Sequence, residues 1–246
     1  MENIKLSYQT MTGETQAIKD ISFTVEAGDF IAIVGPSGCG KSTLLSCVAG
    51  LTQPTSGQVI INGKKVDSIN RYTGYMMQTD NLLPWRTIYS NVLLGLEIQK
   101  KLTEENIAYA EHLLQKYGLW SFRDSYPSAL SGGMRQRVSL IRTLAVKPDL
   151  LLLDEAFSAL DYQTRLNVSR DVYSILRSEK KTMLMVTHDI PEAVSLCDRV
   201  LVLSQRPAVI AADIRCDFGP GRDPVAVRNT QLYHTYFDRV WKEMAE

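Results

Sequence analysis

The sequence predicts an α/β fold: a mostly parallel β-sheet with helices on its faces and a helical segment inserted into it. Two short runs, Phe30–Val34 and Leu150–Leu153, are continuously apolar, which is typical of parallel strands buried on both faces. In the second half of the chain, strand-like runs alternate with helical stretches, and this order favours a parallel sheet. With 246 residues the chain is long enough to bury the core of such a fold.

The first third of the chain is predicted to be mainly strands, because short runs of β-branched and aromatic residues end at turn residues. We expect these strands at Ile4–Tyr8, Ile21–Val25, Phe30–Val34 and Val59–Asn62. The first two alternate between apolar and polar residues, so they are expected to be half-exposed. A helix is expected over Lys41–Ala49, and Gly50 can cap its end.

From about residue 81 to residue 134 the pattern becomes helical, with apolar residues at helical spacing and Gly118 as a stop signal. The remaining elements alternate in type. Strands are expected at Thr73–Met77, Leu150–Leu153, Met183–Thr187 and Val200–Leu203, and helices near Gln163–Arg177, Pro191–Leu196 and Thr230–Glu246.

The composition argues against a chain that is embedded in a membrane or bound to nucleic acid. No segment approaches the roughly 20 apolar residues that span a bilayer, and the first residues lack the apolar core of a signal peptide, so a cytoplasmic location is expected. Lys plus Arg equals Asp plus Glu at 27 each, so any membrane association is expected to come through a protein partner. The four cysteines lack metal-site or disulfide spacing and are expected to be free thiols.

The segment between the strand Phe30–Val34 and the following helix fits the phosphate-loop pattern G-x-x-x-x-G-K-[ST]. Glycines let backbone N–H groups turn inward around phosphate oxygens, and the loop leads into the positive end of a helix. Lys41 is expected to reach the terminal phosphates of ATP, and Ser42 to place its hydroxyl on Mg²⁺. The expected nucleotide contacts are Gly35, Pro36, Ser37, Gly38, Cys39, Gly40, Lys41, Ser42 and Thr43.

A second buried strand, Leu150–Leu153, ends in two acids, Asp154 and Glu155. Consecutive strand residues point to opposite sides, so Asp154 can face the metal while Glu155 addresses an attacking water. An apolar strand that ends in two acids is often only a solvated strand end. The phosphate loop elsewhere in the chain is what favours the catalytic interpretation.

Gln78 and His188 each follow an expected strand, so both are predicted to emerge at the sheet edge that holds the phosphates. An amide and an imidazole can orient a water and contact a γ-phosphate. Taken singly, each is more often a plain polar residue. Together with the acids they complete a predicted set, with Glu155, His188, Gln78 and Lys41 in catalysis and Ser42, Gln78 and Asp154 at Mg²⁺.

The segment Leu130–Arg137, with the sequence Leu-Ser-Gly-Gly-Met-Arg-Gln-Arg, resembles the signature motif of ABC ATPases. Ser131 can cap a helix that begins with two glycines, which makes a second surface for phosphate. One nucleotide does not need two such surfaces from one chain, so the motif favours a homodimer. In the family two domains sandwich two ATPs head to tail, which implies that Ser131, Gly132 and Gly133 meet the γ-phosphate held by the other copy.

The resemblance covers about residues 2–215 and implies a P-loop NTPase core of the ABC ATPase type, with an antiparallel β subdomain and an inserted α-helical subdomain. It divides the chain into a first part of the core (1–80), a helical signature subdomain (81–135), a second part of the core (136–218) and a helical tail (219–246). Asp161 matches the family's D-loop, which lies at the dimer interface. Tyr8 resembles the aromatic residue that stacks on adenine. A departure is Ala156, where many importer subunits carry proline.

Within the family, residues 78–87 and 187–193 look most like the ATPase subunits of nitrate, sulfonate and taurine importers, and importers of thiamine-precursor pyrimidines look similar. This resemblance implies ATP hydrolysis that drives uptake of a small solute through a separate integral membrane permease. The ATPase would lie on the inner face of the membrane, and an extracytoplasmic solute-binding protein would act indirectly. The permease and the binding protein choose the solute, so this chain does not identify it.

Other classes of protein share some of these motifs. An ABC efflux system is the hardest to separate, since only the resemblance around Pro84–Arg86 argues against it. A DNA-repair ABC ATPase would need a very long coiled-coil insertion between Lys41 and Ser131, and a translation-type ABC protein normally carries two cassettes. A small-molecule kinase would have no use for the Ser131 signature, and the acids disfavour a module that binds ATP without hydrolysing it.

Overall fold

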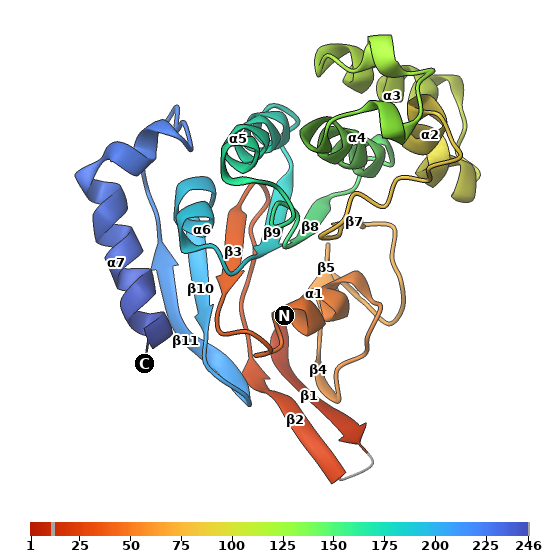
Figure 1. Cartoon of the computed structure of the whole chain (residues 1–246). Coiled ribbons are helices and arrows are strands. Elements are labelled where there is room, and N and C mark those ends of the chain that lie inside the picture. The colour runs from red at the N-terminus through yellow and green to blue at the C-terminus, as the bar shows by residue number, and fades with distance from the viewer. Residues whose placement is uncertain (11–12, 246) are drawn as a thin grey trace.

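The computed structural model describes residues 1–10 and 13–245, and within them nine strands form one sheet in the order β4-β1-β2-β11-β10-β3-β9-β8-β7. Figure 1 shows this sheet with its helices. The strands of the sheet are β1 (Glu2–Thr10), β2 (Gly13–Ile21), β3 (Phe30–Val34), β4 (Ser56–Gln58), β7 (Thr73–Met76), β8 (Leu150–Asp154), β9 (Thr182–Val186), β10 (Arg199–Leu203) and β11 (Ala208–Arg215). A separate pair consists of β5 (Ile60–Ile61) and β6 (Lys64–Lys65).

Helices occupy much of the chain between the strands and after the last strand. They are α1 (Lys41–Ala49), α2 (Ile88–Ile98), α3 (Glu104–Lys116), α4 (Gly132–Ala145), α5 (Tyr162–Ser178), α6 (Ile190–Leu196) and α7 (Gln231–Ala245), with 3₁₀ turns η1 (Trp120–Phe122), η2 (Pro127–Ala129) and η3 (Ala226–Asn229). Gly50 ends α1 with a left-handed φ of 76°, as the sequence predicts. Within the described residues, none of these helices has the length and apolar character needed to cross a bilayer.

The strands β10, β3, β9, β8 and β7 run parallel to one another. Their carboxyl ends therefore meet at one edge of the sheet, and the loops that follow β3, β7, β8 and β9 lie next to one another there. The rest of the sheet is mainly antiparallel, because β11 pairs antiparallel with β10 and β1 pairs antiparallel with both β2 and β4. The predicted α/β sheet with an antiparallel part is confirmed.

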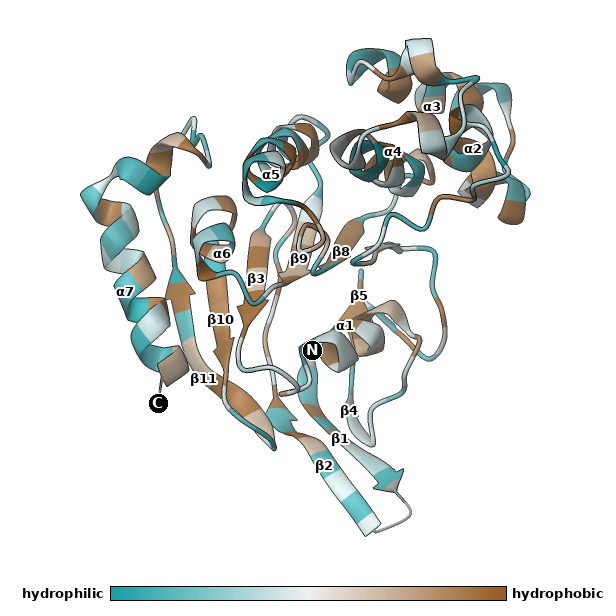
Figure 2. Cartoon of the chain, in the orientation of Figure 1, coloured by the Kyte–Doolittle hydropathy of each residue, from teal (hydrophilic) through white to brown (hydrophobic). Residues whose placement is uncertain are grey.

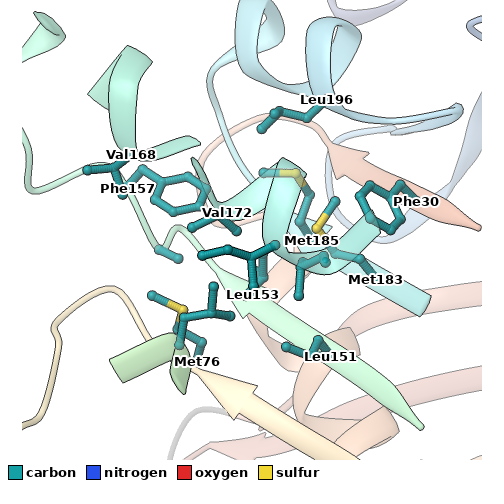
Figure 3. Close-up of a cluster of buried hydrophobic side chains, with 14 of the residues drawn as sticks. Phe30, Met76, Leu151, Leu153, Phe157, Val168, Val172, Met183, Met185 and Leu196 are labelled. Atoms are coloured by element: carbon teal, nitrogen blue, oxygen red, sulfur yellow. The ribbon is translucent and has the colours of Figure 1, made fainter. Parts of the chain in front are cut away.

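The core lies on both faces of the sheet, and β3 divides it. Phe30, Ala32 and Val34 belong to a large buried cluster with side chains from α4, α5 and α6, whereas Ile31 and Ile33 pack with α1, β1 and β2. This alternation is the two-residue period of a strand that is covered on both sides. In Figure 2 the central strands are accordingly the most hydrophobic part of the chain. Figure 3 shows part of the larger cluster around the β8 and β9 side chains.

The helices α2, α3 and α4 pack together, and α4 also packs on α5 and β7, so α4 joins this group to the sheet (Figure 1). The group begins with a loop, whereas the sequence pattern predicts helix from residue 81. Asn91, fully buried in α2, holds this loop: its Nδ2 donates to the carbonyl oxygens of Leu83, Arg86 and Thr87, and its Oδ1 accepts from the N–H of Leu83. The loop therefore has a defined shape that a buried amide maintains.

The strand predictions are wrong or incomplete in several places, and the expected strand Val59–Asn62 is reduced to the two-residue β5. The sequence predicts a strand at Ile21–Val25, whereas β2 covers Gly13–Ile21 and pairs with β1 from Ile4 opposite Ile21 to Thr10 opposite Gly13. Pairing with β1 fixes this strand, and the local pattern does not reveal it. The strand β11, whose mixed burial pattern has no clear alternation, is absent from the predicted strands, as are the short strands β4 and β6.

Candidate active site

Residues 35–40 join β3 to α1 as the phosphate-loop pattern predicts. Gly38 and Gly40 have φ of 75° and 114°, which a side chain would disfavour. Gly40 caps α1 without a side-chain hydrogen bond, so no capping side chain covers the positive end of the helix. Lys41 is buried, and its Nζ donates to the carbonyl oxygens of Gly35 at 2.8 Å and Pro36 at 2.9 Å. These bonds hold the ammonium group over the loop.

Ser42 in α1 and Asp154 at the end of β8 come together. The Ser42 hydroxyl donates to Asp154 Oδ1 at 2.9 Å, and the Tyr75 hydroxyl donates to Asp154 Oδ2 at 2.9 Å. Burial and then the Asp154 charge raise the pKa of Tyr75, so the phenol remains a donor.

The atoms that Ser42 and Asp154 present are oxygens, the ligands that Mg²⁺ prefers. In the part of the chain that the structure describes, no cluster of three or more His, Cys, Asp and Glu side chains could hold a metal by itself. This donor set fits an ion that takes its other ligands from phosphate and water, as Mg²⁺ commonly does.

Glu155 and His188 lie at the ends of adjacent strands, β8 and β9. Glu155 has a left-handed φ of 47°, an uncommon conformation that is frequent at functional sites. Its backbone N–H donates to the carbonyl oxygen of Val186 at 2.9 Å, and its Oε2 lies 3.2 Å from Nδ1 of His188. Both side chains remain partly exposed, so a ligand can reach them.

Gln78 is exposed and lies two residues beyond β7. Because Met76 is opposite Leu153 in the parallel pair β7–β8, Gln78 and Glu155 leave the sheet at the same edge. The following Asp80 contacts α4 through two arginines: Arg135 Nε donates to its Oδ2 at 2.9 Å, and Arg142 Nη2 donates to its carbonyl oxygen at 2.8 Å. The loop after Gln78 is therefore attached to the helix that follows the signature.

Ser131 caps α4 and its Oγ accepts from the N–H of Met134 at 3.3 Å, as the signature pattern predicts. Gly133 is buried, and a Cβ atom at this position would lie 2.9 Å from Val168 Cγ2 in α5, so the glycine permits close packing of α4 on α5. Within the described residues, no hydrogen bond or ion pair joins residues 131–133 to the phosphate loop. In Figure 1, the start of α4 and the start of α1 are separate.

Two predicted residues lie at exposed positions near these elements. Asp161 caps α5 by accepting from the N–H of Thr164 at 3.0 Å, and hydrogen bonds from the Thr164 side chain and then from its backbone lower the pKa of the Asp161 carboxyl. The Tyr8 hydroxyl lies 3.0 Å from Oγ1 of Thr43 in the first turn of α1, which puts the exposed ring beside the phosphate loop. Among the residues that the structure describes, Ser131, Gly132, Gly133 and Asp161 make no hydrogen bond or ion pair with the phosphate loop, Glu155 or His188.

The sequence pattern assigns no role to three groups around this site. Tyr75 supports Asp154 from the neighbouring strand, and the alternation of β7 could have placed it on that face. Asp189 caps α6, and Glu192 lies three residues later, which is the spacing of a helix capping box. Arg165 forms an ion pair with Asp189 at 3.0 Å. Its partner is distant in the sequence, so no local pattern signals this pair.

Comparison with known proteins places this geometry in a family. A family model described as ABC transporter matches residues 18–158. The uncharacterized ABC transporter ATP-binding protein YtlC of Bacillus subtilis is 44% identical, over 99% of this chain and 94% of the relative. The nitrate import ATP-binding protein NrtD of Synechocystis is 40% identical, over 89% and 82%. The aliphatic sulfonates import ATP-binding protein SsuB of Zymomonas mobilis is 43% identical, over 83% and 84%.

A solved structure gives the same result for the fold. A dimeric ATP-binding cassette in a post-hydrolysis state with ADP and Pi has a TM-score of 0.74 and 28% identity, over 89% of this chain and 98% of that one. The predicted P-loop NTPase fold of the ABC type is therefore confirmed, as is the predicted resemblance to nitrate and sulfonate importer ATPases. The chain belongs to the ABC transporter family, and it is one of the family's ATP-binding subunits, which hydrolyse ATP.

Proposed function

We propose that this chain binds ATP with Mg²⁺, hydrolyses it between two copies of itself, and energises uptake of a small solute through a separate membrane permease. The observation that carries the chemistry is the meeting of two pairs, Ser42 with Asp154 and Glu155 with His188, at one edge of the parallel sheet. The phosphate loop leaves β3 at this same edge.

The phosphate loop binds the nucleotide. The glycine backbone and the first turn of α1 offer N–H groups to the phosphates, and the Lys41 ammonium exchanges its two carbonyl partners for the terminal phosphates. Mg²⁺, when bound, neutralises charge on the phosphates. Ser42 and Asp154 are the residues that would hold it, with Gln78 from the next loop. Tyr8 stacks on the adenine.

Hydrolysis needs one water and one base. Glu155 accepts a proton from the water as the water oxygen attacks the γ-phosphorus, and the bond from that phosphorus to the ADP oxygen breaks. His188 holds the Glu155 carboxylate and contacts the γ-phosphate, while Gln78 orients the water. The left-handed backbone of Glu155 fixes the position of the base before ATP arrives.

A second copy of the chain completes the site. The capped, glycine-bearing start of α4 is a phosphate-binding surface that does not contact the phosphate loop of its own chain. Ser131, Gly132 and Gly133 therefore serve the ATP of the other copy, and Asp161 lies at the contact between the two. The dimeric form of the similar solved cassette supports this arrangement.

The loop Leu83–Thr87 receives the permease. It follows Gln78, it is held in shape by Asn91, and its Trp85 side chain is 71% exposed. An exposed indole is a common anchor in protein interfaces. The nitrate and sulfonate importers among the relatives support uptake of a small solute of that kind, with the chain on the inner face of the membrane. A taurine-like or thiamine-precursor-like solute rests only on the resemblance of residues 78–87 and 187–193.

The chemistry is tested with Glu155→Gln, and Glu104→Gln removes an exposed carboxylate in α3 as a control. The Glu155 variant should bind ATP, form a dimer on size-exclusion chromatography and hydrolyse ATP at least about a hundredfold more slowly. The control should turn over normally. Normal turnover in Glu155→Gln would exclude Glu155 as the base.

The transport role is tested by affinity purification from native membranes. Trp85→Ala should lose the permease and keep ATP-dependent dimerisation, whereas Trp241→Ala, at an exposed tryptophan of α7, should keep both. Recovery of the unsubstituted protein without any membrane partner would contradict the transport proposal. The direction of solute flux in membrane vesicles distinguishes import from efflux.

A further inference from the structure

Arg165 connects two loops that leave neighbouring strands. It lies four residues after Asp161, in the first turn of α5, and its Nη2 donates to the carbonyl oxygen of Leu160 at 3.0 Å and reaches that of Ser158 at 3.5 Å. Its Nη1 donates to Asp189 Oδ2 at 3.0 Å. Residues 158–161 follow the proposed base, and Asp189 follows His188. One guanidinium group therefore joins the proposed dimer contact to the loop that carries the proposed γ-phosphate contact.

The Asp189 end of this connection is rigid. Asp189 Oδ1 accepts from the N–H of Glu192, and the Asp189 N–H donates to Thr187 Oγ1 at 3.0 Å. The Thr187 hydroxyl in turn donates to Glu192 Oε2 at 2.6 Å. The Thr187 N–H donates to the carbonyl oxygen of Ile33 in β3, which leads into the phosphate loop. A shift of the Asp189 carboxylate therefore moves the whole segment around His188.

The Ser158–Asp161 end is the exposed one. Arg165 holds it through carbonyl oxygens, so the contact depends on the path of the backbone and not on side-chain identity. The Arg165 and Asp189 side chains are 25% and 22% exposed, so solvent screens this pair less than a surface pair. The Arg165 Nε is buried without a hydrogen-bond partner, so the two Nη groups alone hold the guanidinium in place.

We propose that Arg165 is a positioning residue that transmits contact with a second copy at Asp161 to His188, and so sets His188 against Glu155 for hydrolysis. The inference rests on the proposed dimeric hydrolysis of ATP. A planar guanidinium can donate to both loops at once, whereas the single ammonium of lysine cannot span them in the same way. Arg165→Lys therefore keeps the charge and removes the connection.

The test compares Arg165→Lys with Arg170→Lys, which makes the same substitution on the same helix, at a residue paired with Asp223. Arg165→Lys should lower kcat for ATP by about tenfold or more, because a small misplacement of a catalytic group has effects of this size. The KM for ATP, the midpoint of thermal unfolding and ATP-dependent dimerisation on a Glu155→Gln background should match those of Arg170→Lys. The proposal would be overturned if the kcat of Arg165→Lys equalled that of Arg170→Lys. It would also be overturned if both variants lost kcat only in proportion to a loss of folded protein.

A second measurement asks whether Arg165 acts through His188. In a His188→Ala background, adding Arg165→Lys should cause less than a twofold further loss of kcat, because the residue on which it acts is already absent. Multiplication of the two separate losses would show that Arg165 acts elsewhere and would overturn the inference. The unsubstituted chain distinguishes failure of the Arg165 inference from failure of the proposed function. If the unsubstituted chain shows no ATPase activity or no dimerisation, the proposed function itself is wrong.

Discussion

Glu192 is a buried carboxyl group whose ionisation should make folding depend on pH near neutrality. It lies in the first turn of α6 and accepts from the Thr187 hydroxyl through Oε2, while Oε1 has no partner. Burial is the main cause that raises the pKa of Glu192 to about 7, and the Asp189 charge acts in the same direction. The hydrogen bond from Thr187 and the charges of Arg165 and Arg228 oppose the rise.

The sign and size of the effect follow from linkage. The folded protein keeps a proton that the unfolded chain releases near pH 4.5, so this contribution to stability is complete below pH 4.5 and is lost as the pH rises through about 7. The interval from 4.5 to about 7 corresponds to about 3 kcal/mol of unfolding free energy. Glutamine at position 192 can still accept from Thr187 but cannot ionise, so Glu192→Gln removes this pH dependence.

The measurement is urea unfolding of the unsubstituted chain and of Glu192→Gln between pH 5 and pH 8.5. The stability of the variant relative to the unsubstituted chain should rise by about 2–3 kcal/mol across this range. Glu104→Gln removes an exposed carboxylate and controls for the change in net charge. Parallel curves for Glu192→Gln and the unsubstituted chain would refute the reasoning, because the carboxyl would then ionise equally easily in both states.

Three further substitutions test the packing and the nucleotide site. Gly133→Ala should be about 1–3 kcal/mol less stable to urea than Gly132→Ala. A Cβ atom at position 133 would lie 2.9 Å from the Val168 side chain, whereas a Cβ atom at position 132 would lie 3.4 Å from the Leu160 side chain. Equal stabilities would contradict the packing of α4 on α5. Leu151→Ala should lose about 2–5 kcal/mol of unfolding free energy, since the side chain is fully buried in the cluster of Figure 3, and a loss below about 1 kcal/mol would contradict it. Tyr8→Ala should weaken ATP binding about tenfold by calorimetry while Tyr8→Phe changes it little, and equal affinities would exclude stacking on adenine.

The sequence alone predicts those parts of the site that are local. The phosphate loop, the acids at the end of β8 and the cap of α4 each depend on a few consecutive residues, and the structure forms all three. The β2 strand and Arg165 depend on partners elsewhere in the chain: β2 on the register with β1, and Arg165 on a carboxylate 24 residues away. The left-handed backbone of Glu155 accompanies a hydrogen bond to Val186 on the neighbouring strand, and no pattern around residue 155 predicts either feature.

The buried Asn91 amide holds the backbone of the loop Leu83–Thr87 from inside, and the outward side chains of the loop take no part in these hydrogen bonds. One buried side chain in α2 makes four hydrogen bonds with the loop backbone, whereas Pro84 and Trp85 are exposed. Substitution of these exposed side chains to suit another partner should therefore leave the fold of the loop unchanged, and also the strand ends where the chemistry takes place. This loop is therefore a suitable place at which to design a cassette with altered partner specificity.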